Sequence, residues 1–496
     1  MVTVKELLKG LDLGKSVAEF DEDLEQYFVE TNTFRELIQD RVDIIAGDKG
    51  TGKTAIYRFI QKKYADYPEL EGVNMLAAFN PSGNPIFSSL KDTEPCDEAD
   101  YILLWKSYIL AIVGNWILEV GPDKLKDSTL DKMLTGLGLR SKSYEPRPVW
   151  ERILSKLPNF FQWKSAEVKL TASESGMPIV VPRVEFGKSD SPPPVDERVS
   201  VEDSFKVLDS TLAETGAVVW VNFDRLDEAF QGRPEIEVPA LRALLRTYLD
   251  LYEFKEIRLK LFLRKDLFRR ITTGGFVNLT HINAKKLEIV WDEEDLLNLF
   301  CRRVRKNGPF VDSLGLKDAN DAQIFDRIFP DQVDFGLRKP KTWVWMMRRI
   351  RDGNDIKPPR NLIDLIKFSQ QAQLRKEDRE TRELTDEAII EADALRRGLS
   401  QLSENRVNDT LLAEAGVFAP LIERFRDGKA EHNLESLGGA LGIAPAEAKV
   451  AAKPLVELGF LEEVKGTYKI PALYREGLSV TQGKAFSDEP SDEEDA

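Results

Sequence analysis

The stretch that decides the fold is Gly47-Asp48-Lys49-Gly50-Thr51-Gly52-Lys53-Thr54. It follows the short apolar run RVDIIA at residues 41–46, which predicts a buried strand, and precedes AIYRFIQKKY at residues 55–64, which has helical spacing. The octapeptide fits the pattern G-x-x-x-x-G-K-[ST], which holds phosphate groups where it joins a strand to a helix. The sequence therefore predicts a phosphate-binding loop rather than a glycine turn without a ligand.

Each type of residue in this loop has a chemical use. Because Gly47, Gly50 and Gly52 have no Cβ atom, they allow positive φ and let successive backbone N–H groups point at phosphate oxygens. The helix that begins near Lys53 adds the positive end of its dipole. Lys53 is predicted to bridge the β- and γ-phosphates, and the Thr54 hydroxyl is predicted to be a Mg²⁺ ligand. All eight residues of the loop are candidate nucleotide contacts.

A phosphate loop of this kind needs a metal-holding carboxylate on a neighbouring strand. The apolar run AVVWVNFD at residues 217–224 ends in Asp224, which we expect to hold Mg²⁺ through water. Asp227 or Glu228, just downstream, would orient and deprotonate the attacking water, and the sequence favours Glu228. The alternative for this stretch alone is a buried strand that ends in a solvated acidic turn.

A further apolar strand is predicted at residues 257–263, and it is followed by Arg264. In a parallel nucleotide-binding sheet this strand end faces the ligand, so Arg264 is placed to sense or stabilise the γ-phosphate. The alternative is an arginine that pairs with Asp266 or with a surface carboxylate. No guanine-reading Asn/Thr-Lys-x-Asp motif occurs in the sequence, so ATP is the expected nucleotide.

Composition narrows the class of protein. A chain of 496 residues predicts two to four domains. Residues 101–120 are the most apolar stretch, but they contain charged residues, which favours a buried helix over a membrane span. Residues 1–16 have no apolar region of the kind that directs export, so we expect a cytoplasmic protein with no membrane partner. The net charge of -15 argues against a protein that coats nucleic acid over its whole surface.

Cysteine and histidine are too few for several kinds of chemistry. Cys96 and Cys301 are far apart in the sequence and form no spaced cluster, so they predict two buried thiols rather than a disulfide framework or a zinc site. The two histidines, His281 and His432, have no cysteine or carboxylate at ligand spacing. Metal-hydrolase and histidine-based triad mechanisms therefore have little to work with.

Taken together, GDKGTGKT, VNFDRLDE, LFLRKD and LEIVWDEEDLL before an arginine-rich helix resemble the STAND and origin-recognition (AAA+-like) P-loop ATPases, and in detail a bacterial P-loop ATPase family close to them. The resemblance covers most of residues 20–480. It implies an α/β core of the ASCE type with strand order 5-1-4-3-2, a helical lid and a C-terminal winged helix. In such proteins an arginine of strand four and one of the lid contact the nucleotide, and the matching positions here are Arg264 and Arg360.

The domain organisation that follows has five parts. It consists of an N-terminal helical segment (1–40), a P-loop ATPase core (41–291) with an insertion at about 80–200, a helical lid (292–400), a winged helix-turn-helix (405–480) and an acidic disordered tail (481–496). Within the insertion, residues 168–187 alternate like a β-hairpin, and a loop follows. The insertion carries partner specificity or only enlarges the core.

Two basic features leave the question of nucleic acid open. Residues 338–360 contain eight Lys or Arg and two Asp, a net of +6 in a chain whose total is -15. This stripe is either a solvated helix face or a surface for phosphates, nucleic acid or an acidic partner. In the winged helix, the second helix carries Lys449 and Lys453 against Glu447 and Glu457. Packing against the lid or against another protein is therefore favoured over DNA recognition.

The function that fits these observations is an ATP-binding and hydrolysing switch, with ATP and Mg²⁺ as cofactors, whose nucleotide state sets its engagement of a partner protein or of sister subunits in a homo-oligomer. The resemblance places it in prokaryotic regulation, DNA maintenance or anti-phage defence. One alternative is a DNA-binding ATPase that acts through its winged helix and basic lid. Another is a scaffold that binds ATP structurally and does not hydrolyse it.

Overall fold

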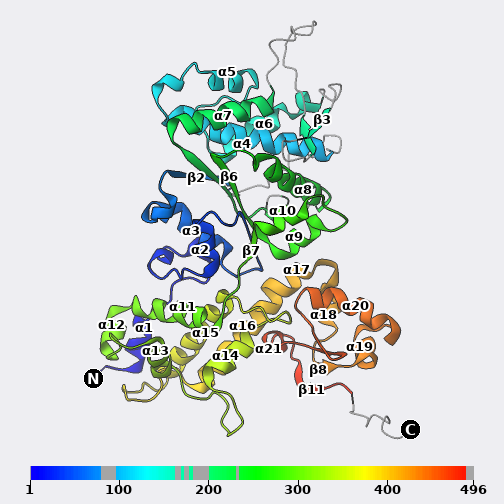
Figure 1. The fold of residues 1–496 in the computed structure, drawn as a ribbon. Coiled ribbons are helices and arrows are strands. Elements are labelled where there is room, and N and C mark those ends of the chain that lie inside the picture. Colours follow the sequence, from blue (N-terminus) through cyan, green and yellow to red (C-terminus); the bar gives the residue numbers. More distant parts are fainter. Residues whose placement is uncertain are drawn as a thin grey trace. The chain divides into compact units, whose positions relative to one another are not determined.

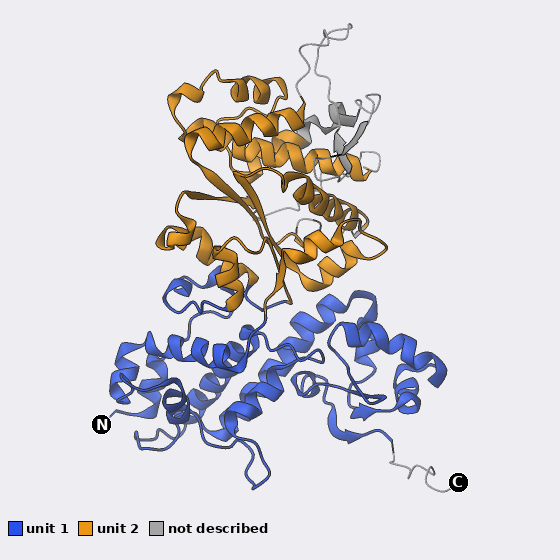
Figure 2. Ribbon diagram, in the orientation of Figure 1, with its two compact units in different colours: residues 1–31, 49–52, 290–496 blue, residues 32–48, 53–289 orange. Residues whose placement is uncertain are grey.

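The computed structural model describes residues 2–79, 97–161, 169–172, 178–181, 200–228, 230 and 234–486. It divides the chain into two compact units (Figure 2). Unit 2 comprises residues 32–48 and 53–289, and unit 1 comprises residues 1–31, 49–52 and 290–496. The two ends of the predicted phosphate loop thus belong to unit 2, and its tip groups with unit 1.

Unit 2 is built on a parallel sheet, which has, within the described ranges, five strands in the order β2-β5-β6-β1-β7 (Figure 1). The strands are β1 (Ile44–Gly47), β2 (Val73–Phe79), β5 (Val218–Phe223), β6 (Ile257–Arg264) and β7 (Lys286–Glu288). Every pairing between neighbours is parallel. Counted along the chain within this sheet, the order is 5-1-4-3-2, as predicted.

Helices cover both faces of this sheet, which explains why its central strands are continuous apolar runs. In Figure 1, α2 and α3 lie on one side of the sheet and α8, α9 and α10 on the other. The strand β1 is buried at all its positions. The helices of unit 2 are α2 (Asn32–Ile38), α3 (Lys53–Lys63), α4 (Glu98–Val120), α5 (Thr129–Gly136), α6 (Pro146–Phe161), α7 (Val201–Thr215), α8 (Pro234–Leu251), α9 (Lys265–Thr272) and α10 (Leu279–Ala284).

The most apolar stretch of the chain forms α4. Asp97 caps its N-terminus, accepting a hydrogen bond from the Asp100 backbone in a capping box. In the described part of the chain, α4 is the one helix that is long and apolar enough to cross a membrane. Its most apolar 18 residues are, however, 94% buried inside the protein. It packs against α6, α7 and α8. Its apolar character on all sides is therefore explained by helices that surround it.

The predicted hairpin at residues 168–187 is described only in part. β3 (Lys169–Ala172) and β4 (Pro178–Val181) pair antiparallel, with Lys169 opposite Val181. This agrees with the alternating pattern of the sequence. The remaining residues of the predicted hairpin, and the loop that follows it, lie outside the described residues. Cys96 lies outside them too, whereas Cys301 is fully buried and burial raises its pKa to about 12.

Unit 1 has a helical part that precedes a smaller sheet. Its helices are α1 (Val4–Gly10), α11 (Glu293–Arg305), α12 (Gly308–Ser313), α13 (Asp321–Ile328), α14 (Thr342–Ile350), α15 (Pro359–Glu377), α16 (Ala392–Arg406), α17 (Ala413–Ala415) and α18 (Ala419–Glu423). The longest pair, α15 and α16, pack against each other, and α1 packs against α15. One apolar core, which contains Leu8, Trp345 and Leu395, runs through these helices.

The C-terminal segment, residues 429–484, carries the helices and the hairpin predicted there. Its elements are β8 (Lys429–His432), α19 (Leu434–Leu441), α20 (Pro445–Glu457), β9 (Glu462–Val464), β10 (Thr467–Lys469), α21 (Ala472–Arg475) and β11 (Thr481–Lys484). The strands form a sheet in the order β11-β8-β10-β9. Lys465 and Gly466 join β9 to β10 with positive φ at both positions, the geometry of a tight hairpin turn. The first four residues of the predicted tail form β11.

Candidate nucleotide-binding site

The candidate site lies at the carboxyl edge of the sheet of unit 2. Three parallel strands end there with residues that the sequence singled out: Gly47 ends β1, Asp224 follows β5, and Arg264 ends β6. The register pairs Gly47 with Arg264 directly across β1 and β6. Ligands of open α/β sheets bind at this edge, where the strand order reverses beside β1. The strand order thus brings together residues that are about 40 to 220 positions apart in the sequence.

Lys53 begins α3, and its side chain turns back over the start of the loop. Its Nζ donates hydrogen bonds to the backbone carbonyls of Gly47, at 2.8 Å, and Asp48, at 2.9 Å. Burial lowers the pKa of Lys53, while the nearby carboxylates of Asp224 and Asp227 oppose that shift. A phosphate group would give this ammonium a stronger, charged acceptor than the two carbonyls.

Two acidic side chains of the β5 end lie within electrostatic reach of Lys53. Asp224 is buried, with 2% of its surface exposed, and Asp227 is partly exposed. Arg225, between them, has a φ of +59°, which is unfavourable for a residue with a Cβ atom and marks a tight turn. This turn is what allows both carboxylates to act on the same lysine.

Arg264 is held by carboxylates in this structure. It forms a two-pronged ion pair with Asp266, with N–O distances of 3.0 and 3.2 Å, and a longer contact of 3.7 Å with Asp227. The sequence left open whether Arg264 pairs with Asp266 or faces the ligand. In the structure Arg264 pairs with Asp266 and also lies at the sheet edge beside the loop.

Glu228, the favoured candidate base, points to a different partner. Its Oε1 accepts hydrogen bonds from Arg225, at 2.7 Å from Nε and 2.6 Å from Nη2. Asp227 is one of the carboxylates that oppose the lowering of the Lys53 pKa. Asp227 therefore has an electrostatic link to the loop lysine.

The glycines of the loop differ in their backbone geometry. Gly50 has a φ of +81° and Gly52 a φ of +101°, so both use the conformation that favours glycine. Gly47 instead continues the extended backbone of β1 as its last residue. Asp48 follows it, and burial raises the pKa of this carboxyl group, an effect that Lys265 and Lys53 oppose.

Within unit 1, the loop tip contacts three segments of the helical part. Lys49 forms an ion pair with Glu414, and the indole Nε1 of Trp291 donates a hydrogen bond of 2.7 Å to the Thr51 carbonyl. Gly50 faces the start of α15, where an added Cβ would lie 3.2 Å from the Cβ of Arg360. The close approach and the positive φ therefore both require glycine here.

Arg360 has a polar atom that nothing in the described part of the chain satisfies. Its Nε is buried and has no hydrogen-bond partner there. A buried N–H without an acceptor is costly, and an anion at the loop tip would supply one. The contact of Arg360 with the nucleotide stays a prediction.

Three contacts of the loop were not foreseen. Trp291 and Glu414 hold the loop tip, and Pro358 lies beside Gly50. In the sequence, Trp291 is marked only as an aromatic residue next to an acidic run, which is a weak indication of a contact with the loop. Nothing in the sequence indicates such a contact for Glu414. Their roles depend on a tertiary arrangement that no spacing in the sequence records.

The donor set fits a magnesium nucleotide. Thr54 and Asp224 offer the hydroxyl and carboxylate oxygens that Mg²⁺ takes, and the loop and Lys53 offer N–H donors for phosphate. The edge has several cations, among them Lys53 and Arg264, and several carboxylates. Such a mixed site suits a ligand that carries both phosphate and a divalent cation.

Comparisons with known proteins give remote similarities. No protein-family model matches the sequence. A curated relative, the putative transposon gamma-delta 80.3 kDa protein of Escherichia coli strain K12, is 22% identical over 340 residues, which is 66% of this chain and 43% of that protein. The chain therefore spans less than half the length of this relative.

Solved structures with similar folds cover most of the chain at low identity. A Walker-type ATPase of Pyrococcus abyssi is 12% identical, with 95% of this chain and 100% of that chain covered and a TM-score of 0.40. The ORC2 protein of Aeropyrum pernix, in ADPNP–ADP complexes, is 14% identical, with 91% and 93% covered and a TM-score of 0.36. The ORC1 protein of Aeropyrum pernix, in complex with DNA, is 12% identical, with 94% and 96% covered and a TM-score of 0.33.

At these scores the similarities add no detail to the site, which rests on the geometry of the chain itself. A strand, a glycine loop and a helix occur in the required order, and the 5-1-4-3-2 sheet places an acidic strand end beside the loop. By these features, unit 2 has the fold of a P-loop NTPase core.

Proposed function

We propose that this protein binds ATP with Mg²⁺ at the loop of residues 47–54 and hydrolyses it. The observation that carries the proposal is the meeting of Lys53, Asp224, Asp227 and Arg264 at the carboxyl edge of one parallel sheet. Phosphoryl transfer needs a positioned phosphate, charge stabilisation and an oriented nucleophile. These four side chains and the loop N–H groups supply the first two, and a carboxylate supplies the third.

The roles follow from the contacts of each side chain. Lys53 would exchange its two carbonyl acceptors for phosphate oxygens, and Arg264 would stabilise charge on the γ-phosphate. Bound Mg²⁺, held by Thr54 and Asp224, would neutralise charge on the phosphates. Asp227 faces both Lys53 and Arg264, so we assign it the orientation and deprotonation of water, in place of Glu228.

The contacts of the loop tip support a switch. Phosphate at the loop would act directly on Gly50 and Thr51, which contact Arg360 and Trp291. Trp291 lies two residues before α11, next to its N-cap Asp292, and Arg360 lies in the first turn of α15. A ligand that draws Arg360 Nε to a phosphate oxygen would bias the position of α15 relative to the loop. This is the behaviour expected of a helical lid in a STAND or AAA+-like ATPase.

The C-terminal segment is the proposed site of partner engagement. Its order of α19, α20 and the β9–β10 hairpin supports the proposal that it is a winged helix. On α20 the exposed Lys449 and Lys453 are balanced by the exposed Glu447 and Glu457. Because DNA recognition requires a basic helix, a protein partner or a second copy of the chain is favoured over DNA. The regulatory or anti-phage setting is a prediction that rests on the resemblance alone.

The test is ATP turnover by the purified protein, with Lys53→Ala as the blank and with DNA present or absent. Turnover above the blank that does not change with DNA is the expected result. Turnover that rises with duplex or single-stranded DNA would favour the DNA-binding ATPase. Binding of MgATP without turnover would favour the scaffold, and the absence of both binding and turnover would overturn the proposal.

A further inference from the structure

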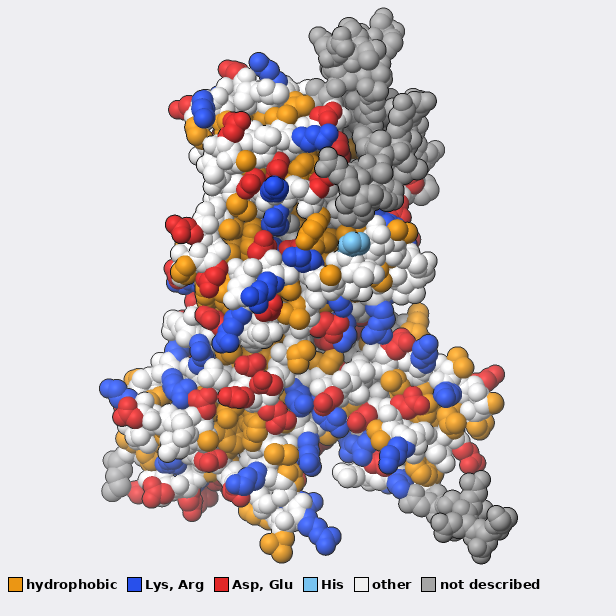
Figure 3. Space-filling model, viewed as in Figure 1, with side chains coloured by type: hydrophobic (Ala, Val, Ile, Leu, Met, Phe, Trp, Pro, Cys, Tyr) orange, Lys and Arg blue, Asp and Glu red, His pale blue; other side chains and the backbone are white. Residues whose placement is uncertain are grey.

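A second concentration of positive charge lies wholly within unit 1. On the face shown in Figure 3, Lys and Arg side chains gather where α14, α21 and the sheet of the C-terminal segment meet. A cavity of about 770 Å³ opens at this place. Small-molecule sites in proteins have volumes of roughly 300 to 1,000 Å³, so the space suits a ligand of nucleotide size.

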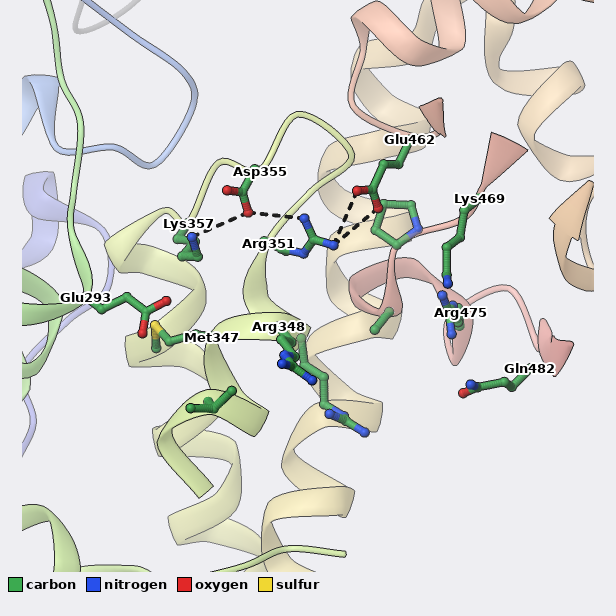
Figure 4. A pocket seen from close by; sticks show the side chains of 14 residues that line it. Glu293, Met347, Arg348, Arg351, Asp355, Lys357, Glu462, Lys469, Arg475 and Gln482 are labelled. Carbon is green, nitrogen blue, oxygen red and sulfur yellow. Dashed lines mark hydrogen bonds and ion pairs between the residues drawn. The ribbon is translucent and has the colours of Figure 1, made fainter. Parts of the chain in front are cut away.

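The charge of the cavity lining is strongly unbalanced. Six lining side chains are cationic and three are acidic, in a chain with a net charge of -15. The cations are Arg348, Arg349, Arg351, Lys357, Lys469 and Arg475. Figure 4 shows that they come from two walls, with Arg348 and Arg351 on the α14 side and Lys469 and Arg475 on the side of the C-terminal segment.

Some of these cations already have carboxylate partners. Arg351 pairs with Asp355 and Glu462, and Lys357 pairs with Asp355, a chain of contacts drawn in Figure 4. Lys469 pairs with Glu431 at 2.6 Å. These ion pairs hold the side chains at the rim of the cavity. They also neutralise part of its positive charge, so fewer cations are available to a ligand than the lining contains.

Two arginines on opposite walls have no such partner. Within the described residues, neither Arg348 nor Arg475 forms an ion pair with a carboxylate. Arg348 is exposed at the end of α14, and Arg475, which is partly buried, donates a hydrogen bond of 2.8 Å to the Ile470 carbonyl. The dipole of α14 accounts for a cation at its C-terminus, but not for cations on the facing wall.

Apolar side chains complete the lining. Val344 and Met347 of α14 lie on one wall, and Pro471 and Ala472, at the start of α21, lie on the other. Val344, which is exposed, and Ala472, which is partly exposed, offer contact area for an uncharged ring next to the cationic groups, whereas Met347 and Pro471 are buried behind them. The combination of fork-shaped guanidinium donors and an apolar surface is typical of sites for phosphorylated organic ligands.

We infer that this cavity is a second anion site, which binds a small oligophosphate ligand between Arg348 and Arg475. The inference goes beyond the proposed ATPase activity and does not depend on the P-loop. The limited volume and the acidic side chains of the rim, Asp355 and Glu462, disfavour the long backbone of a nucleic acid. Because the ligand would bridge α14 and α21, it would hold the C-terminal segment against the helical part.

The experiment uses the full chain with Lys53→Ala, so that the P-loop does not compete for the probe. Sodium tripolyphosphate is titrated calorimetrically without Mg²⁺. We expect binding that Arg348→Gln weakens about tenfold or more, since hydrogen bonds to charged groups are among the stronger ones. Arg338→Gln is the matched control, because Arg338 is exposed in the same basic stretch but does not line the cavity, and it should leave the affinity unchanged.

Four further measurements make the result decisive. Arg475→Gln should reproduce the loss, and circular dichroism should show that each variant is folded. ATP without metal should bind at least as tightly as tripolyphosphate: equal affinity indicates phosphate recognition alone, and tighter binding indicates contact of the nucleoside with the apolar wall. Duplex DNA of about 20 base pairs is the competing ligand.

The inference is overturned by any one of three results. The first is the absence of tripolyphosphate binding at millimolar concentration. The second is binding that Arg348→Gln and Arg475→Gln do not weaken. The third is DNA binding that depends on Arg348 and that tripolyphosphate does not displace, which would make the surface a nucleic-acid site. None of these results bears on the proposed ATPase site, because the variant used in these experiments already lacks Lys53.

Discussion

The sheet edge of unit 2 and the cavity of unit 1 both gather cations, but they balance them differently. At the sheet edge, Lys53 and Arg264 lie among Asp224, Asp227 and Asp266. In the cavity, cations outnumber acids by six to three. A charge-balanced site suits a ligand that brings its own metal ion, and a cation-rich site suits a bare anion. The balance of charge therefore distinguishes two kinds of phosphate recognition within one chain.

The sharpest way to break this comparison is to remove the loop lysine. Lys53→Ala should lower MgATP turnover more than about 100-fold, because one preorganised donor at a developing charge is worth that much in other enzymes. Tripolyphosphate binding, measured without metal, should be unchanged. A loss of both activities in the folded variant would mean that the two sites are one functional unit.

Next in size is the effect of the two candidate bases. Asp227→Asn should lower turnover about 100-fold while MgATP still binds, because general base catalysis contributes about that much. Glu228→Gln, which weakens the pairing with Arg225, should lower turnover less than about tenfold. Rates at saturating ATP, with affinities from calorimetry, separate chemistry from binding. The reverse order of effects would give the catalytic role to Glu228.

Salt concentration should affect ligand binding at the two sites to different extents, with a smaller effect than the substitutions. Raising NaCl from about 50 to about 500 mM should weaken tripolyphosphate binding about tenfold, because exposed, unbalanced cations act through a field that salt screens. MgATP binding at the loop should weaken only a few-fold, since backbone N–H groups and paired charges hold the ligand. Equal salt dependence at both sites would contradict the difference in charge balance.

The smallest expected effect is that of pH on MgATP affinity. Burial lowers the pKa of Lys53 from its ordinary value of 10.5. Phosphate binds the protonated form, so affinity should fall a few-fold as the pH rises from about 7 to about 10, through the lowered pKa. Lys53→Arg, which stays charged over this range, should abolish the trend if the variant binds MgATP. A trend that persists in Lys53→Arg would assign it to another group.

Local patterns in the sequence predicted most of the core. The run before Gly47 and the runs before Asp224 and Arg264 are strands β1, β5 and β6, because buried parallel strands are continuous apolar stretches that are readable without a partner. The apolar stretch of residues 101–120 forms the buried helix α4, as its charged residues indicated. The helices and hairpin of the C-terminal segment follow turn and spacing signals that are equally local.

Contacts between distant residues were not readable in this way. The sequence placed Asp227 and Glu228 side by side as candidate bases, and only the turn at Arg225 separates their partners. Trp291 gives no motif for its hydrogen bond to Thr51. The positive net charge of residues 338–360 did not show which arginines of this segment form ion pairs with carboxylates. Asp334, which pairs with Arg349, and Glu462, which pairs with Arg351, lie outside the segment.

The sequence by itself determined the order of strand, glycine loop and helix, the acidic strand end and the absence of a guanine motif, and the resemblance implied the strand order. These depend on short-range spacing and on residue types whose chemistry is fixed. The tertiary structure alone decided which carboxylate faces Lys53, what touches the loop tip, and that Arg348 and Arg475 face one cavity from two walls. Such properties depend on which side chains, distant in the sequence, come into contact when the chain folds. The free energies of burial and of charge pairing arise only from those contacts.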